Sequence, residues 1–306
     1  MKKMFFVCLS LLLLFSCATL QNKFNFFGGK DGAVGGKGVV LKFIEAPDNN
    51  EEIIEGFPFN VKLQIDNFVE TEPGLIGEVC LRDRRISRSG NDGIADNGDC
   101  KPISLRPADN GNPYSEEYFF GPYSYFYVEK EFKEDVVIYA EVFYEVQSIA
   151  GALMCVKRPA TQGQNIPANC GKKQDLQIQQ PDLPIKISRL TTKASSTEFE
   201  STIELEIALT KVETGQVVTK SSTIDKISSK ADIEFEVLAN NLQVVCNNAG
   251  NNRLELRQNE NEKIIKCFIK IPLNQDVVDI PIRIKTGYGF IQSIPGRTIK
   301  LVKGGI

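Results

Sequence analysis

Six cysteines outside the N-terminal leader are the residues with the clearest chemistry in this sequence: Cys80, Cys100, Cys155, Cys170, Cys246 and Cys267. An even number of cysteines in an exported chain is typical of disulfides, although six thiols allow many pairings. Pairing each cysteine with its nearest neighbour is the simplest hypothesis: Cys80 with Cys100, Cys155 with Cys170, and Cys246 with Cys267. The chain has no Cys-x-x-Cys pair and no histidine, which argues against a zinc site or a thiol redox centre.

The absence of histidine also limits catalysis. Serine and cysteine nucleophiles usually need a histidine base, so those mechanisms are excluded in their usual form. Carboxylate chemistry stays open, because Asp and Glu together number 39. Adjacent acids such as Glu51-Glu52 and Glu116-Glu117 lie in polar segments, and we interpret them as solvated surface rather than as a glycosidase-like pair. We therefore expect no enzymatic activity and rank a hydrolase third among the functional hypotheses.

An acidic loop between Cys80 and Cys100 holds the only candidate metal ligands. Asp92, Asp96 and Asp99 are interspersed with Asn and Gly, and such closely spaced oxygens suit Ca²⁺. The spacing lacks the order of an EF-hand and its closing Glu. A solvent-facing loop with turn chemistry is the favoured interpretation, and no other cofactor is expected.

An aromatic segment between residues 114 and 127 is the candidate partner-binding surface. Its tyrosines are Tyr114, Tyr118, Tyr123, Tyr125 and Tyr127. Phe120-Gly121-Pro122-Tyr123 predicts a hairpin turn, so alternate rings face opposite sides of a strand. One face can fill the core, and the other can contact a protein or a glycan because tyrosine buries area at low entropic cost. Core and edge packing remains the favoured alternative.

The N-terminal leader indicates export. Lys2 and Lys3 precede an apolar run from Met4 to Phe15, which is too short to span a bilayer as a helix. The run ends at Ser16-Cys17 and resembles prokaryotic lipoprotein signals, in which the cysteine is lipidated before cleavage. The resemblance implies a signal peptide at 1–16 and a membrane anchor at Cys17. Cleavage by a general peptidase, leaving Cys17 unmodified or lost, is the alternative. The glycine-rich residues up to 38 predict a flexible tether over 17–38.

The charge of the chain bears on its partners. The net charge of −3 becomes −5 once Lys2 and Lys3 are removed with the leader. A mildly acidic chain without a basic block argues against binding to nucleic acid. We therefore expect an extracytoplasmic protein at the cell surface, whose partners are the membrane, through the lipid, and envelope or surface proteins or a glycan.

The body of the chain alternates with a period of two. Phe59, Val61, Leu63 and Ile65 alternate with polar residues, as do Ile203, Leu205, Ile207 and Leu209. Helical signals are nearly absent, so the sequence predicts an all-β protein of sandwich type. These two strands lie 144 residues apart. A pentapeptide, Gln147 to Gly151, recurs at Gln292 to Gly296 with an offset of 145. We interpret the offsets as a duplication that gives two domains, 39–182 and 183–306.

The run from Glu55 to Asn67 resembles the early strand of immunoglobulin-like and cell-adhesion-related bacterial domains. The resemblance covers about thirteen residues and transfers no catalytic residue. It implies two tandem immunoglobulin-like β-sandwiches on a lipoprotein tether. The first hypothesis is a non-catalytic structural or protein-binding module at the cell surface. The second is a glycan- or ligand-binding accessory lipoprotein that uses the aromatic segment.

Overall fold

The fold is all-β. The computed structural model describes residues 34–35, 38–70, 73–85, 93–94, 98–126, 134–157, 170, 173–196, 200–222, 224, 228–247, 249–272 and 277–304. The leader, Cys17 and most of the predicted tether lie outside these residues. Within the described part, the regular elements are strands and one 3-10 turn, η2 (Gly250–Asn252). The predicted fold class is therefore confirmed at the level of an antiparallel, sandwich-like all-β protein. None of the described helical segments is long and apolar enough to cross a membrane.

Within the described ranges, seventeen strands make up three sheets. The strands are β1 (Val34–Gly35), β2 (Val39–Glu45), β3 (Glu52–Ile54), β4 (Phe59–Asn67), β5 (Leu75–Arg85), β6 (Asp99–Leu105), β7 (Tyr114–Tyr123), β8 (Glu134–Lys157), β9 (Lys173–Asp175), β10 (Ile185–Ser196), β11 (Glu200–Lys211), β12 (Gln216–Val218), β13 (Lys230–Ala239), β14 (Val244–Cys246), β15 (Arg253–Arg257), β16 (Glu262–Pro272) and β17 (Val277–Val302). A central sheet has the order β15-β13-β17-β8-β5-β6, with β12 and β3 added at β17. Two further sheets, β1-β2-β4-β7 and β14-β16-β11-β10-β9, complete the fold.

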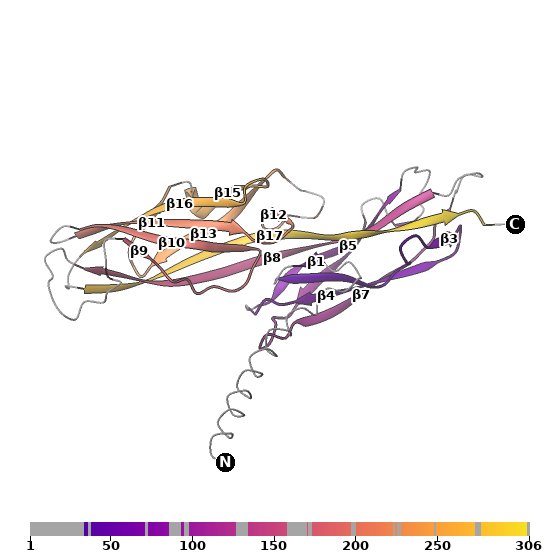
Figure 1. The fold of residues 1–306 in the computed structure, drawn as a ribbon, viewed down its shortest axis with the longest axis horizontal. Helices are drawn as coiled ribbons and strands as arrows, with labels where there is room; N and C mark the ends of the chain where they lie inside the picture. Colours follow the sequence, from indigo (N-terminus) through magenta and orange to yellow (C-terminus); the bar gives the residue numbers. More distant parts are fainter. Residues whose placement is uncertain are drawn as a thin grey trace, which may run out of the picture.

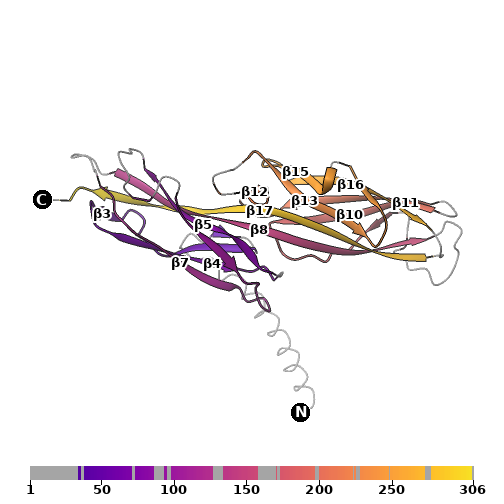
Figure 2. The ribbon, with the colours of Figure 1, turned by 180° about the vertical axis from the view of Figure 1, so that it is seen from behind.

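The molecule is elongated and has two lobes (Figures 1 and 2). The first lobe contains β1 to β7, and the second contains β9 to β16. In each lobe one of the smaller sheets lies over one half of the central sheet. The strand order of the central sheet reads alike from both ends, since β6, β5 and β8 in one direction match β15, β13 and β17 in the other. The two lobes therefore repeat one arrangement of strands.

Strands β8 and β17 are shared by both lobes. They pair antiparallel from Val277 with Lys157 to Leu301 with Glu134, with an irregularity between Ile294 and Arg297. As a result, the C-terminal half of β17 lies in the first lobe and the C-terminal half of β8 lies in the second (Figure 1). The division at residues 182 and 183 stays a prediction. Strand β8, which precedes it, extends into the second lobe, and β17, which follows it, extends into the first.

The core follows the predicted alternation. Val61, Leu63 and Ile65 of β4 and Leu205 and Ile207 of β11 are fully buried. Each such side chain contributes about 1.5–3 kcal/mol through burial. The predicted correspondence of β4 with β11, at an offset of 144, is thus one in which matching residues face the same way.

The pentapeptide match does not have this property. Ile149 is 57% exposed, whereas Ile294, its counterpart at an offset of 145, is 2% exposed. Successive strand residues face opposite sides of a sheet, so an error of one residue exchanges the two faces. An offset of 144 pairs Tyr144 with Tyr288 instead, and both are fully buried. The expectation that Gln147 to Gly151 and Gln292 to Gly296 are equivalent is therefore wrong along β8 and β17.

Candidate functional site

The predicted aromatic segment forms β7 and the residues directly after it. β7 is the last strand of its sheet and pairs with β4 along one edge. Tyr118 is 9% exposed and Tyr125 is 1% exposed, so both rings lie in the core. Tyr114 and Tyr123 are half-buried and pack against the same core. Tyr127 lies outside the described residues. The role of these tyrosines in partner binding stays a prediction, and the structure places four of the rings toward the interior.

The exposed aromatic side chain of β7 is Phe119. Its ring is 60% exposed, and the Lys62 ammonium lies 4.8 Å from the ring centroid. Lys62 also forms an ion pair of 2.6 Å with Glu117 on β7. Sequence reasoning concentrated on tyrosines and missed Phe119, although its alternation with Tyr118 and Phe120 already assigns it to the outer face.

The acidic loop and the aromatic segment meet at one end of the first lobe. The Tyr123 hydroxyl donates a 2.6 Å hydrogen bond to Asp99, and the Gly93 N–H donates to the Ser124 carbonyl. Burial, followed by the Asp99 contact, raises the pKa of Tyr123. Asp99 is therefore engaged with a protein donor. Asp92 and Asp96 lie outside the described residues, so the Ca²⁺ hypothesis stays a prediction.

The edge of the first lobe between β7 and β6 is closed by side chains. The Lys101 ammonium on β6 donates to the carbonyl of Phe119 and lies 4.9 Å from the Phe120 ring centroid. A positive charge over an edge strand disfavours the addition of another strand. The edge of β7 is thus a poor docking site for an extended partner.

Three disulfides join the cysteines as nearest neighbours in sequence. Cys80–Cys100 links β5 to β6, and Cys246–Cys267 links β14 to β16. Cys155–Cys170 fastens the end of β8 to the chain just before β9. The predicted pairing is confirmed. The Glu78 carboxylate lies within 4.8 Å of the sulfurs of Cys80 and Cys100, but a disulfide offers no thiolate to a metal.

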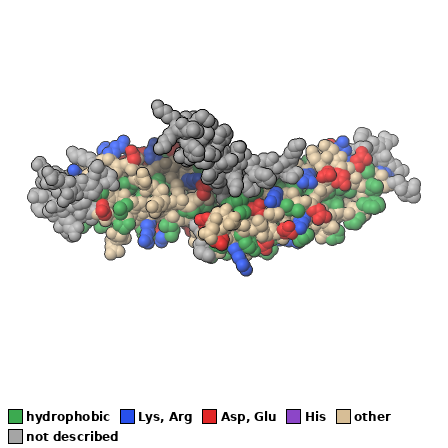
Figure 3. Space-filling model, turned by 60° about the horizontal axis from the view of Figure 1, so that its bottom comes forward, with side chains coloured by type: hydrophobic (Ala, Val, Ile, Leu, Met, Phe, Trp, Pro, Cys, Tyr) green, Lys and Arg blue, Asp and Glu red, His purple; other side chains and the backbone are tan. Residues whose placement is uncertain are grey.

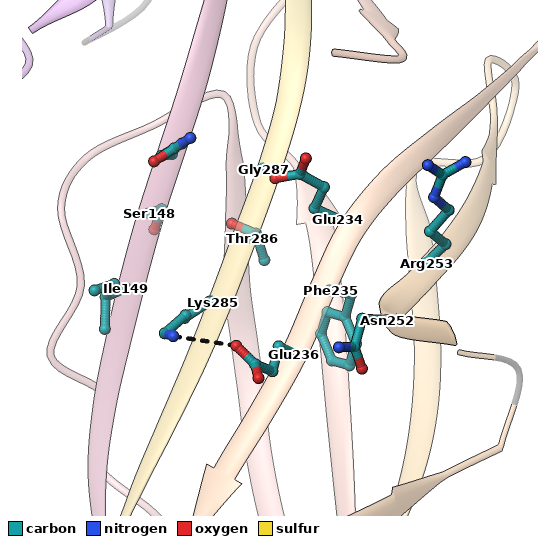
Figure 4. Close-up of a pocket in the computed structure, with 11 residues that line it drawn as sticks. Ser148, Ile149, Glu234, Phe235, Glu236, Asn252, Arg253, Lys285, Thr286 and Gly287 are labelled. Carbon is teal, nitrogen blue, oxygen red and sulfur yellow. Dashed lines mark ion pairs between the residues drawn. The ribbon is translucent and has the colours of Figure 1, made fainter. Parts of the chain in front are cut away.

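A hollow of about 750 Å³ lies on the outer face of the central sheet in the second lobe. Its floor contains Gln147 and Ile149 of β8, Lys285 and Gly287 of β17, and Glu234 of β13. The Lys285 ammonium forms a 3.1 Å ion pair with Glu236, and the Glu234 carboxylate lies across Gly287 (Figure 4). Sequence reasoning missed this hollow, and alternation alone gives no specific signal for it, because Val137, Phe143 and Leu153 are also apolar residues at odd positions of β8.

One face of the molecule carries both signs of charge. Lys, Arg, Asp and Glu side chains are interspersed over the visible face (Figure 3). Pairs such as Lys266 with Glu204, at 2.7 Å, cross between neighbouring strands. Such a face offers no extended field for a strongly charged polymer.

Comparisons with known proteins add no family. No protein-family model matches the chain, and no curated protein or solved structure shows significant similarity to it.

Proposed function

We propose that this chain is an exported, membrane-tethered module of the cell surface with a structural or protein-binding role and no catalytic activity. The observation that carries the proposal is the pair β8 and β17, which runs through both lobes. Bending between the lobes would break the hydrogen bonds of a continuous ladder, so the body acts as one stiff rod. A stiff, disulfide-bonded rod suits a protein that presents surfaces at a distance from a membrane.

The start of the described chain supports a tether that joins the rod near its middle. The Gly38 N–H donates a 3.1 Å hydrogen bond to Glu213, which follows β11 of the second lobe. Strand β17 ends at the far tip of the first lobe (Figure 1). A lipid at Cys17 would then hold the rod at its junction and leave both tips free to contact neighbours.

We also infer that each lobe is an immunoglobulin-like sandwich. In the first lobe the sheet that contains β2, β4 and β7 faces β6, β5 and β8, and the second lobe repeats this order with β10, β11 and β16. Antiparallel sheets packed in pairs are the arrangement of that family. The exchange of the last long strand between the lobes is the departure from two independent sandwiches.

Glycan binding at β7 is the second candidate function. Phe119 supports it, since an exposed ring beside the Lys62 ammonium could stack on a sugar. Phe119→Ser should abolish glycan capture and leave the melting temperature within about 2 °C, because the ring is exposed. Capture that is unchanged in Phe119→Ser would remove this candidate.

Crosslinking in intact cells tests the main proposal. The full chain should crosslink to one or a few envelope proteins, identified by mass spectrometry, and should do so only when it is membrane-bound. A matched Cys17→Ser strain controls for anchoring. If the chain shows no neighbours among envelope proteins in either strain, the proposed function is wrong.

A further inference from the structure

A strap from the second lobe crosses the outer face of the central sheet into the first lobe. We define the strap as residues 216–222 and 224, which begin with β12. Val217 of β12 pairs with Phe290 of β17 and is buried in the main core. Val218 and Ile224 are 2% and 3% exposed, and they pack in a separate apolar cluster with Cys80, Phe143 and Ile291. The strap therefore covers a site that strands β17, β8 and β5 build together.

Carboxylates fix the backbone of the strap. The Ser221 N–H donates to Glu145 at 3.0 Å, and the Ile224 N–H donates to Glu78 at 3.1 Å. Hydrogen bonds from a backbone donor to a charged acceptor are among the stronger ones in proteins. The covered site thus combines a free strand edge, an apolar floor and a carboxylate that accepts a backbone N–H.

The repeat of the two lobes places a second copy of this site in the second lobe. An offset of 144 moves Phe143 to Gly287 and Ile291 to Gln147. Glu78 pairs with Phe143 on the neighbouring strand, and Glu234 pairs with Gly287 in the same way. At the same offset the β12 partners Gly289 to Ile291 move to Glu145 to Gln147, and Gly287 and Gln147 replace the two apolar side chains. The hollow drawn in Figure 4 begins at this Gln147 and continues along β8 to Ile149, and we call it the open site.

The edge of β8 at the open site has free pairing positions. Gly151 exchanges two backbone hydrogen bonds with Gln179 on the side away from β17, which shows where the odd-numbered residues of this half of β8 direct their polar groups. Farther along β8, the Gln174 side chain accepts a hydrogen bond from the Cys155 N–H and donates one to the Cys155 carbonyl. Within the described residues, the backbone groups of Gln147 and Ile149 have no partner along this edge. The Ile149 side chain beside them is 57% exposed.

We propose that the open site binds an extended segment of a partner polypeptide. The segment adds as a short strand at Gln147 to Ile149, passes over Gly287 with an apolar side chain in the hollow, and donates a backbone N–H to Glu234. The Glu234 carboxylate also forms a 3.6 Å ion pair with Lys220 of the strap. The occupant is argued from the covered site, which the chain fills with a strand of sequence Gln-Val-Val. Strand addition uses main-chain hydrogen bonds for affinity and alternate side chains for selectivity. This inference rests on the proposed protein-binding function.

The test uses the purified, oxidised full chain and a fluorescent peptide with the sequence of residues 214–224. Saturable binding by fluorescence polarisation is expected. Gln147→Pro removes an edge N–H, and Ile149→Lys places a charge at the edge, so each should weaken binding about tenfold or more. Glu234→Gln should weaken it by a smaller factor. A peptide N-methylated at both valines should not bind.

Leu153→Lys is the matched control. Leu153 is 60% exposed on the same face of β8, but the edge beside it is already occupied by Gln174 and Gln179. Its affinity for the peptide should stay within about twofold of the unmodified chain. No saturable binding, or an equal loss in Leu153→Lys and Ile149→Lys, would overturn the inference. Melting temperatures of all variants verify that each is folded.

The outcome separates this inference from the proposed function. Peptide binding without any envelope neighbour in intact cells would support the open site and contradict the surface role. Envelope neighbours whose crosslinking is unchanged by Ile149→Lys would support the surface role and contradict the open site.

Discussion

Tyr144 of β8 and Tyr288 of β17 lie at equivalent positions of the two shared strands, and both are fully buried at the junction of the lobes. Their hydroxyls differ. Tyr288 accepts a 3.0 Å hydrogen bond from the Ile185 N–H, whereas the Tyr144 hydroxyl has no hydrogen-bond partner within the described residues. Burial raises the pKa of both tyrosines, so both stay neutral in the folded protein.

Because of this difference, Tyr→Phe should change the free energy of unfolding differently at the two positions. Tyr288→Phe leaves the buried Ile185 N–H without an acceptor and should lower the free energy of unfolding by about 1–3 kcal/mol. Tyr144→Phe removes a buried hydroxyl that lacks a partner and should be neutral or stabilising. Urea denaturation measures both. Equal destabilisation in the two variants would contradict the assigned contacts.

Asp66 predicts a loss of stability in acid. Burial alone would raise its pKa, but hydrogen bonds from Ser115, Gln64 and Lys42 outweigh burial and hold the pKa below its ordinary value. A carboxyl with a lowered folded pKa stabilises the fold above its unfolded pKa, about 3.9, and loses this contribution as the pH falls through the folded value.

Asp66→Asn should therefore lower the free energy of unfolding by about 1–3 kcal/mol at pH 7. The difference in this free energy between the variant and the unmodified protein should narrow below about pH 4. Denaturant titrations between pH 7 and pH 2.5 measure this difference. Glu117→Gln, in an ion pair whose carboxyl is 46% exposed, is the control and should change stability by less than about 1 kcal/mol. A difference for Asp66→Asn that does not depend on pH would refute the role of this carboxylate.

Removing the Cys80–Cys100 disulfide or the Cys246–Cys267 disulfide should lower the free energy of unfolding by a similar amount. Cys80 and Cys100 are 20 residues apart, and Cys246 and Cys267 are 21 apart. Chain entropy depends on loop length, so each double Cys→Ala variant should lose about 3 kcal/mol. Thermal or urea unfolding measures the losses, and non-reducing peptide mapping verifies the pairs. Six free thiols in the exported protein would contradict the oxidised state.

The proposed lipid anchor predicts that one substitution moves the protein from the membrane fraction to the soluble fraction. Cys17→Ser removes the proposed acylation site, so the protein should leave the membrane fraction and appear in the soluble one. Two acyl chains bind a bilayer stably, and removal of the acylation site takes this anchor away. Ultracentrifugation of cell extracts followed by immunoblotting measures the change. A variant that stays with the membrane would exclude this anchor.

Much of the fold follows from the sequence. Alternation in residues such as Val61 and Leu205 predicts the strands and their inward faces, and an even number of cysteines after a leader typical of export predicts the disulfides. Both signals are local, or nearly so, and need no knowledge of the tertiary fold.

The sharing of β8 and β17 could not be predicted in this way. A continuous strand of 26 residues has the same alternation as two shorter strands, and only the partners on its two sides reveal that it crosses lobes. The pentapeptide match gave a wrong equivalence for a related reason. Ile149 and Ile294 are the same residue type, but this does not say on which face of the sheet each side chain lies. The open site exists because no described strand pairs with β8 at Gln147 and Ile149, and which strands pair there is decided by the tertiary fold.

Surface digestion of intact cells tests most directly whether the protein is exported as an oxidised, tethered rod. Protease added outside the cells should degrade the protein, which should be recovered from untreated cells in the membrane fraction with its six thiols paired as Cys80–Cys100, Cys155–Cys170 and Cys246–Cys267. A protease-resistant, fully reduced chain in the cytosol that still carries residues 1–16 would contradict the account.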